Sequence, residues 1–349
     1  MPSTTFRIGG DLTVGRLGFG AMHLPTERPE DRPSAVAVAR RAVELGITLI
    51  DTAHLYGNGA NEEALAEALH PYPKDLLITT KVGVLRSAET GEWALNGRPE
   101  SLRTEVDHAL HRLRVDRLEL LQLHRIDPET PLADQLGALR DLRDEGKVAR
   151  IGLSEVTAAE LAAAREIVDI ASVQNRYNLT DREHEPVLEA CEAAGIAFLP
   201  WRTVAWGKAG DRAEVAAIAA ELDATPTQVC LAWLLDHSPV MLPIPGTSSI
   251  AHLEENVAAA DLVLTPELRA RLDGIAGDES TQRTGSRSSS TSAPRSSASS
   301  GRTGERGEAF HLLFTEGGDL TTELTHDKAS QRNAQIHTLN AYAHHERAG

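Results

Sequence analysis

The regular alternation of short apolar runs with helix-compatible stretches is the feature that most constrains the fold of this chain. The alternation begins near residue 17 and provides eight strand–helix units before residue 277. The runs are continuously apolar instead of alternating, which is typical of parallel strands buried on both faces. Eight such units favour a closed (β/α)8 TIM barrel over an open, doubly wound sheet.

The elements are predicted from apolar periodicity and from helix start and stop residues. The predicted strands span 17–22, 47–52, 76–82, 118–124, 149–155, 171–178, 196–201 and 240–246. The predicted helices span 34–45, 61–70, 99–113, 133–145, 157–168, 182–194, 211–222, 226–237, 249–260 and 264–275. Asn61 is the expected N-cap of its helix, since its side chain can accept a hydrogen bond from the first turn. A hairpin over 6–17 is expected to close the bottom of the barrel.

The composition changes after Gly277, where apolar residues almost vanish and Ser, Thr, Arg and Gly dominate. Such a stretch cannot offset its ordering entropy by burial. The predicted domains are therefore a barrel over 1–277, a Ser/Arg-rich disordered linker over 278–308, and a C-terminal extension over 309–349. This extension is expected to be disordered or loosely docked.

The charge and the cysteines limit the class of partner. The formal net charge of −16 is spread along the chain, which argues against a nucleic-acid or anionic-membrane partner. Cys191 and Cys230 imply no disulfide framework, so a cytoplasmic location is expected. The first residues do not read as a signal peptide, and no apolar run approaches the ~20 residues of a membrane span. A monomer and a weak oligomer both remain open.

Four ionisable residues follow early strands, at the face where barrel enzymes carry their chemistry. Asp51 and Tyr56 lie in DTAHLYG, Lys81 ends the run LLITTK, and His124 ends LELLQLH. Each alone has an ordinary structural interpretation, such as a cap, a packed aromatic, an ion pair or a hydrogen-bonded core histidine. Together, four such groups at adjacent strand ends would be costly to bury without a function.

The chemistry that this set suggests is proton transfer at a carbonyl. Free tyrosine titrates near pH ~10, and a nearby ammonium such as Lys81 favours the tyrosinate. Asp51 can hold Lys81 charged, and His124 can hydrogen-bond the substrate oxygen. Tyr56 would then be the general acid or base, while the hydride must come from a cofactor.

These motifs resemble the aldo-keto reductase family over roughly residues 6–275. The resemblance rests on DTAHLYG (51–57), ITTKVG (78–83), LLQLHRID (120–127), IGLSE (151–155), SVQNRYN (172–178), AFLPW (197–201) and IPGTSSIAHLEEN (244–256). It implies a (β/α)8 barrel that binds NADPH without a Rossmann domain and reduces aldehydes or ketones to alcohols. It also implies the catalytic roles described above for Asp51, Tyr56, Lys81 and His124.

The resemblance further implies a set of cofactor contacts. They are Gly20, Ala21 and Met22 at the first strand end, Asp51 at the ribose, Ser154 and Gln174 at the carboxamide, Trp201 at the nicotinamide ring, and Thr247, Ser248, His252, Glu255 and Asn256 at the adenosine end. The Gly-Thr-Ser-Ser turn that opens the last of these segments could bind a phosphate, or it could be an ordinary helix cap.

Three departures from the family pattern bear on the cofactor and the substrate. Glu155 stands where the family often has Asn, and RTVAWG (202–207) stands where it often has Pro-Leu-Ala-x-Gly. His252 and Gly246 replace cations that many members carry, so NADP(H) is favoured with NAD(H) as an alternative. Trp93 and Trp206 are pocket candidates, and each could instead anchor a loop.

Two other functions remain open at this stage. A protein of this fold could bind NADP(H) as a non-catalytic regulatory or interaction subunit. A metal-dependent barrel hydrolase could use Asp51, His54 and His124, although more converging ligands would be needed than the sequence offers.

Overall fold

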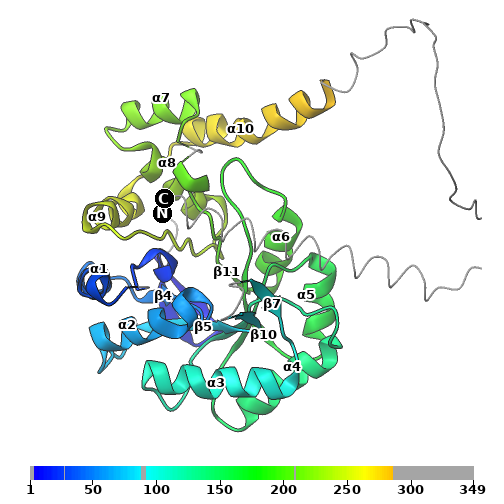
Figure 1. Ribbon diagram of the computed structural model, residues 1–349. Coiled ribbons are helices and arrows are strands. Elements are labelled where there is room, and N and C mark those ends of the chain that lie inside the picture. The colour runs from blue at the N-terminus through cyan, green and yellow to red at the C-terminus, as the bar shows by residue number, and fades with distance from the viewer. Residues whose placement is uncertain (1–3, 27, 88–91, 208–209, 286–349) are drawn as a thin grey trace, which may run out of the picture.

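A curled parallel sheet surrounded by helices forms the body of the protein (Figure 1). The computed structural model describes residues 4–26, 28–87, 92–207 and 210–285. The predicted extension over 309–349 and most of the predicted linker lie outside these residues. Among the described helices, none combines the length and the apolar character of a membrane span.

The parallel sheet runs in the order β3-β4-β5-β8-β9-β10-β11, so each strand pairs with the next sheet strand along the chain. Its strands are β3 (Phe19–Gly20), β4 (Leu49–Asp51), β5 (Leu77–Val82), β8 (Leu121–Leu123), β9 (Ile151–Ser154), β10 (Ile170–Gln174) and β11 (Ala197–Phe198). Strand residues are almost all buried, as continuous apolar runs predict for a sheet covered on both faces.

The eighth strand position is occupied by residues 240–246, which bridge to β11 on one side and to β3 on the other. On the β3 side, the amides of Gly18 and Gly20 donate to the carbonyls of Pro243 and Pro245 at 2.9 and 3.1 Å. Proline has no amide hydrogen, so this segment closes the barrel through isolated bridges instead of a regular ladder. The predicted TIM barrel is confirmed.

Two glycines allow this closure. A Cβ on Gly20 would lie 2.7 Å from the Ile244 carbonyl oxygen, and a Cβ on Gly246 would lie 2.8 Å from the Gly20 oxygen. Both gaps are smaller than a van der Waals contact, so any larger residue would push the first and last strand positions apart.

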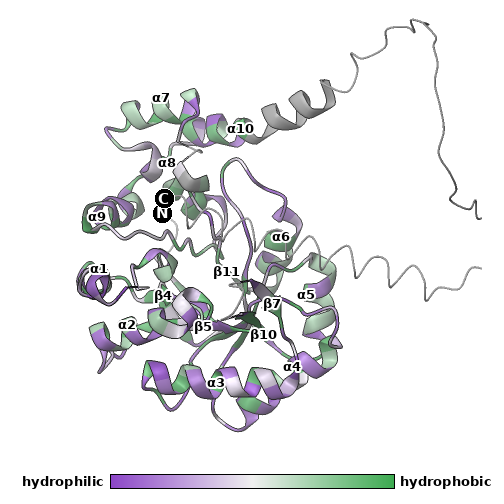
Figure 2. Ribbon diagram, viewed as in Figure 1, coloured by the Kyte–Doolittle hydropathy of each residue, from purple (hydrophilic) through white to green (hydrophobic). Residues whose placement is uncertain are grey.

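Helices surround the barrel and carry apolar residues on the faces that they bury (Figure 2). They are α1 (Arg32–Glu44), α2 (Ala60–Leu69), α3 (Pro99–Leu113), α4 (Leu132–Asp144), α5 (Ala158–Arg165), α6 (Glu185–Ala194), α7 (Ala213–Glu221), α8 (Pro226–His237), α9 (Ile250–Ala258) and α10 (Pro266–Gly285). Helix α10 continues beyond the boundary expected at residue 277. Its Asp273 carboxylate accepts a 2.8 Å hydrogen bond from Trp233 of α8.

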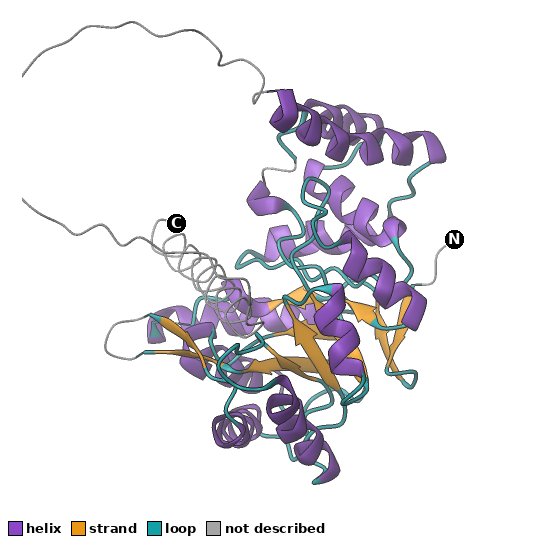
Figure 3. Cartoon of the chain, turned by 90° about the vertical axis from the view of Figure 1, so that its right-hand side faces the viewer, coloured by secondary structure: helices purple, strands orange, loops and turns teal. Residues whose placement is uncertain are grey.

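Two hairpins flank the barrel. The first, β1 (Thr5–Ile8) and β2 (Leu12–Gly15), agrees with the prediction and packs Ile8 against Leu49 and Leu77, which begin β4 and β5. It therefore closes the end of the barrel opposite the strand ends that carry the predicted site. The second hairpin, β6 (Val84–Arg86) and β7 (Trp93–Leu95), was not predicted and projects from the side of the barrel (Figure 3).

Asn61 is not the N-cap that the sequence suggested. Helix α2 begins at Ala60 with Gly59 as its N-cap, and Asn61 lies fully buried inside it. The Asn61 side chain accepts a 2.7 Å hydrogen bond from the Thr52 hydroxyl and donates one of 2.8 Å to the Ala21 carbonyl. It therefore joins α2 to the segments that follow β3 and β4, a contact that only the tertiary fold creates.

Candidate active site

The structure brings Asp51, Tyr56, Lys81 and His124 together at the carboxyl ends of neighbouring strands. Asp51 is the last residue of β4, Lys81 lies near the end of β5, and His124 directly follows β8. Tyr56 begins the short 3-10 helix η3 (Tyr56–Gly59). Three of the four therefore lie at strand ends, and Tyr56 lies in the loop that follows β4.

Lys81 is the centre of this group. Its Nζ donates to Asp51 Oδ2 at 2.6 Å, to the Thr52 carbonyl oxygen at 2.9 Å and to the Tyr56 hydroxyl at 3.2 Å. Its side chain is fully buried. The ammonium is thus paired with a carboxylate on one side and bonded to a phenol on the other.

The second oxygen of Asp51 is fixed by two amides. Gln174 Nε2 donates to Asp51 Oδ1 at 2.8 Å, and Gln122 Nε2 donates to the same oxygen at 3.2 Å. These glutamines come from β10 and β8, so three strands hold one carboxylate. Gln174, which was expected at a cofactor carboxamide, contacts Asp51 in this structure.

Burial and charge control the protonation states of the two nitrogen bases. Burial lowers the pKa of Lys81, and the Asp51 carboxylate opposes this effect. Burial, together with the positive charges of Arg125 and Lys81, holds the pKa of His124 well below its ordinary value. His124 is therefore a neutral imidazole at neutral pH, and its ring lies edge-on to Tyr56 with the ring centroids 6.4 Å apart.

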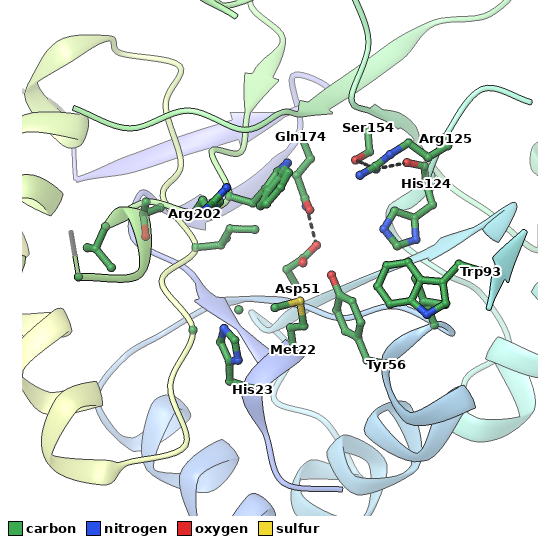
Figure 4. A pocket seen from close by; sticks show the side chains of 18 of the residues that line it. Met22, His23, Asp51, Tyr56, Trp93, His124, Arg125, Ser154, Gln174 and Arg202 are labelled. Carbon is green, nitrogen blue, oxygen red and sulfur yellow. Dashed lines mark hydrogen bonds between the residues drawn. The ribbon is translucent and has the colours of Figure 1, made fainter. Parts of the chain in front are cut away.

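A cavity of about 470 Å³ opens over these groups (Figure 4). Tyr56, His124 and Trp93 lie close together on one side of it, away from Arg202 (Figure 4). Its described lining consists of Gly20, Met22, His23, Asp51, Leu55, Tyr56, Trp93, His124, Arg125, Ser154, Gln174, Trp201, Arg202, Thr203, Val204, Gly207, Ile244, Gly246 and His252.

Several expected cofactor residues lie outside this described lining. Ala21 is fully buried in an apolar cluster between the barrel and α1. Thr247 accepts a hydrogen bond from the Ser249 amide, while Ser248 is exposed. The Glu255 carboxylate accepts a 2.6 Å hydrogen bond from Thr225.

Asn256, an expected cofactor contact, and Trp206, an expected pocket residue, have different outcomes. Asn256 is 7% exposed on the buried face of α9. Trp206 belongs to the 3-10 helix η4 (Ala205–Gly207), and its side chain lies outside the described residues. The helix-cap interpretation of the turn before α9 gains support, because Ser249 caps α9 by accepting a hydrogen bond from the His252 amide.

Trp201 is anchored by Glu155, one of the departures from the family pattern. The indole Nε1 donates to Glu155 Oε1 at 2.6 Å, and the Arg176 amide donates to the same oxygen at 2.6 Å. Glu155 has a φ of 54°, a left-handed conformation that is uncommon for such a side chain. The backbone turn thus aims a carboxylate at the nitrogen of a cavity-lining ring.

The sequence reasoning missed three basic residues of the cavity wall: His23, Arg125 and Arg202. Each directly follows a residue that was predicted, namely Met22, His124 and Trp201. The available signal was position, because residues next to a strand-end side chain share the same face of the barrel. Arg125 is the most buried of the three at 5% exposure.

The hydrolase alternative finds no support in the geometry. Among the described residues, no group of three or more His, Cys, Asp and Glu side chains could hold a metal ion. His54 Nδ1 lies 3.1 Å from Arg112 Nη2, and burial with this cation lowers the His54 pKa to about 4. His54 is thus held by α3 and does not converge with Asp51 and His124 on one point.

The sequence model of the Aldo/keto reductase family matches residues 16–276. The chain belongs to the aldo/keto reductase family. It is 43% identical to an uncharacterised oxidoreductase of Schizosaccharomyces pombe over 78% of this chain and 90% of that protein. It is 39% identical to the pyridoxine 4-dehydrogenase of Escherichia coli, over 79% of this chain and 99% of that one.

Solved structures of the family share the fold. The glycerol dehydrogenase of Gluconobacter oxydans is 25% identical, with a TM-score of 0.74 over 80% of this chain and 96% of that chain. An aldo/keto reductase of Klebsiella pneumoniae, solved in complex with NADP and acetate, is 26% identical, with a TM-score of 0.70 over 78% of this chain and 95% of that chain. The predicted family and the class of oxidoreductase are confirmed, and neither the family nor these relatives support a non-catalytic subunit.

Proposed function

We propose that this protein is an NADP(H)-dependent reductase of aldehydes or ketones, with Tyr56 as its general acid. The observation that carries the proposal is the contact of the Tyr56 hydroxyl with the buried Lys81 ammonium at 3.2 Å. Family membership and the NADP complex of the Klebsiella pneumoniae relative support the cofactor.

The cavity wall fits a dinucleotide cofactor in two respects. Gly20 and Gly246 line the cavity with backbone atoms alone. Trp201 offers an aromatic ring, and its nitrogen is already bonded to Glu155. Met22, Ser154, Gln174 and His252 would complete the contacts along the cavity. Trp201 would stack on the nicotinamide, whereas Ala21, Thr247, Ser248, Glu255 and Asn256 remain expectations from the family resemblance.

The chain's own residues can manage the proton and the charge of the reaction. The bound cofactor supplies the hydride to the carbonyl carbon. Tyr56 donates its proton to the carbonyl oxygen, and the Lys81 ammonium stabilises the phenolate that remains. Asp51 holds Lys81 in position, and neutral His124 can donate a hydrogen bond that orients the same carbonyl oxygen.

NADP(H) is favoured and NAD(H) is an alternative. Arg202 lines the cavity and supplies a cation that the sequence reasoning had not included. His252 also lines the cavity and could contact a ribose phosphate, although an imidazole is a weaker anion ligand than the arginine found in many members. Parallel assays with both cofactors decide the preference.

The substrate is a small-molecule carbonyl compound. Trp93 lines the cavity beside Tyr56 and His124, which supports its predicted role at the substrate end. The two free cysteines are buried, and the charge of −16 disfavours nucleic acid. We therefore expect a cytoplasmic enzyme without a nucleic-acid or membrane partner, as a monomer or a weak oligomer.

The test is consumption of NADPH by the purified protein with a panel of aromatic and aliphatic aldehydes. Replacement Tyr56→Phe removes the hydroxyl while keeping the ring, so turnover should fall at least 10²-fold, within the range of a lost general acid. NADPH affinity, measured by quenching of tryptophan fluorescence, should change little. Wild-type turnover in the Tyr56→Phe variant would disprove the acid–base assignment.

A further inference from the structure

Gln122 is a fully buried glutamine of β8 whose side chain lies beside the reacting groups. In the register of the sheet it pairs with Lys81 of β5, so the two side chains point to the same face. Gln122 is not among the described residues that line the cavity. A role in the reaction must therefore act through a neighbouring side chain and not on the substrate itself.

Each polar atom of the Gln122 amide has a partner. Its Nε2 donates to Asp51 Oδ1 and to the Thr79 hydroxyl oxygen, both at 3.2 Å. Its Oε1 accepts a hydrogen bond from Gln174 Nε2 at 3.4 Å. Because a carboxylate can only accept hydrogen bonds, the nitrogen of the amide and not its oxygen must face Asp51.

A glycine on the next strand leaves room for this long side chain. Gly152 of β9 pairs in register with Gln122. A Cβ on Gly152 would lie 3.0 Å from Cγ of Gln122, closer than an ordinary van der Waals contact. A buried amide is costly unless it is hydrogen-bonded. The barrel interior thus accommodates a polar side chain here and satisfies it.

The hydrogen bonds to Asp51 divide the two oxygens of its carboxylate. Oδ2 accepts from Lys81 Nζ at 2.6 Å, and Oδ1 accepts from the amides of Gln122 and Gln174. Gln174 lines the cavity, so a ligand can compete for its amide, whereas Gln122 lies behind the lining. The contact from Gln122 is therefore the one that does not depend on what occupies the cavity.

We propose that Gln122 is a positioning residue for the carbonyl reduction, which holds the Asp51 carboxylate so that Oδ2 faces the Lys81 ammonium. This inference rests on the proposed function and adds a residue to its machinery. The path to the general acid is short: 3.2 Å from Gln122 to Asp51, 2.6 Å from Asp51 to Lys81, and 3.2 Å from Lys81 to the Tyr56 hydroxyl.

The pH profile separates this role from a packing role. Burial lowers the pKa of Lys81 and the Asp51 carboxylate raises it, so a displaced carboxylate weakens the support of the ammonium. The other titratable or charged groups that act on this ammonium stay unchanged in a Gln122 variant; they are Tyr56, Glu62, His124 and Arg125.

Gln122→Met keeps the length of the side chain and removes the donor. With NADPH and the best aldehyde of the panel, kcat should fall about tenfold, as expected for one hydrogen bond to a charged group. KM for the aldehyde should change little, because Gln122 lies outside the described lining. The alkaline limb of kcat/KM should move to lower pH, by less than in Asp51→Asn, since Gln174 still holds Oδ1.

Gln135→Met is the matched control. Gln135 of α4 is also fully buried, and its side chain bonds to backbone atoms of Asp127 and Thr130. Its loss should lower the melting temperature, as the loss of Gln122 should, but should leave the alkaline limb at the wild-type position. Melting temperatures of both variants show the cost to stability.

Gln122→Glu keeps the shape of the side chain and tests the donor directly. The introduced carboxyl can donate to Asp51 only while it is protonated, and it repels Asp51 when it is ionised. The three ammonium hydrogens of Lys81 already have acceptors, so the new charge finds no donor there. Activity relative to wild type should therefore be severalfold higher at about pH 6 than at about pH 8.

The failure of this inference is distinct from the failure of the proposed function. An alkaline limb at the wild-type position in folded Gln122→Met would overturn the inference, whether or not kcat falls. If Gln122→Met does not fold, Gln122→Glu decides, and a relative activity that is independent of pH would overturn the inference. Absence of wild-type turnover with every aldehyde would reject the proposed function and this positioning role with it.

Discussion

Arg112 donates a hydrogen bond of 2.6 Å to the carboxylate of Glu62, and this pair connects two segments of the active site. Glu62 is fully buried and also accepts a 2.6 Å hydrogen bond from the hydroxyl of Thr80, the residue before Lys81. A second nitrogen of the Arg112 guanidinium, Nη2, lies 3.1 Å from Nδ1 of His54, which belongs to the loop that carries Tyr56. The ion pair thus links the β5 strand end to that loop.

Replacement of Arg112 by Met should therefore lower both stability and turnover. The buried Glu62 carboxylate would lose its cation, which typically costs about 3–5 kcal/mol. Loss of the link between the β5 strand end and the Tyr56 loop should lower kcat about tenfold. KM for the aldehyde should change little, because Arg112 contacts neither the cavity nor the reacting groups among the described contacts. Chemical denaturation and steady-state kinetics measure the two effects.

The double variant Glu62→Gln/Arg112→Met separates stability from positioning. Removing both charges eliminates the unpaired carboxylate, so much of the stability should return. The link between Thr80 and His54 would still be missing, so kcat should remain low. Recovery of kcat together with stability would show that the pair acts only through folding.

The pairing of Lys81 with Asp51 predicts how activity depends on alkaline pH. Burial lowers the pKa of Lys81 and the Asp51 carboxylate raises it, with burial as the larger effect. Since the ammonium supports Tyr56, kcat/KM should fall as the pH rises through a value below the ordinary 10.5 of lysine. In Asp51→Asn the opposing charge is lost, so this alkaline limb should move to lower pH. An unchanged limb would mean that another group controls it.

The strand-end chemistry could be predicted from sequence because it depends on order along the chain. A parallel barrel brings the carboxyl ends of its strands to one face, so residues 51, 81 and 124 must meet there once the strands are recognised. Helix α3 begins and ends at the predicted residues, Pro99 and Leu113, because a proline at its first position marks its start.

Contacts between distant segments could not be predicted in this way. Asn61 is typical of an N-cap by residue type, but in the fold it serves as a buried link between Thr52 and Ala21. Glu255 contacts the cap of α8, a partner 30 positions earlier in the chain. The hairpin β6–β7 has strands of three residues each, too short for an alternating pattern to be recognised.

Glu155 should influence cofactor binding through Trp201. A carboxylate bonded to the indole nitrogen makes the ring a better partner for a positively charged nicotinamide. Glu155→Gln keeps an oxygen that can accept the hydrogen bond but removes the charge, so affinity for NADP+ should fall severalfold more than affinity for NADPH. Fluorescence titration of both cofactors gives the ratio. An equal loss for both forms would indicate that Glu155 only positions the ring.

The buried Glu105 carboxylate predicts a pH-dependent stability. It accepts hydrogen bonds from the Gly83 amide at 3.0 Å and the Ser101 hydroxyl at 3.3 Å, and burial raises its pKa to about 7. Between pH 4.5 and 7 the folded protein holds a proton that the unfolded chain releases. The folded state therefore binds more protons, and the contribution of Glu105 to stability is lost as the pH rises through this range.

Glu105→Gln removes this dependence, so its stability relative to wild type should increase with pH. Between pH 4.5 and 8 the stability of Glu105→Gln relative to wild type should increase by up to about 3 kcal/mol. This follows because the pKa of Glu105 is raised by about two pH units or slightly more, and each unit corresponds to about 1.4 kcal/mol. Glu100→Gln, which removes a carboxylate at an exposed position on the same helix, is the matched control. Urea denaturation at a series of pH values measures both variants. A stability difference for Glu105→Gln that stays constant over this range would mean that the carboxylate is already charged in the folded protein, held by the Gly83 amide and the nearby Arg112.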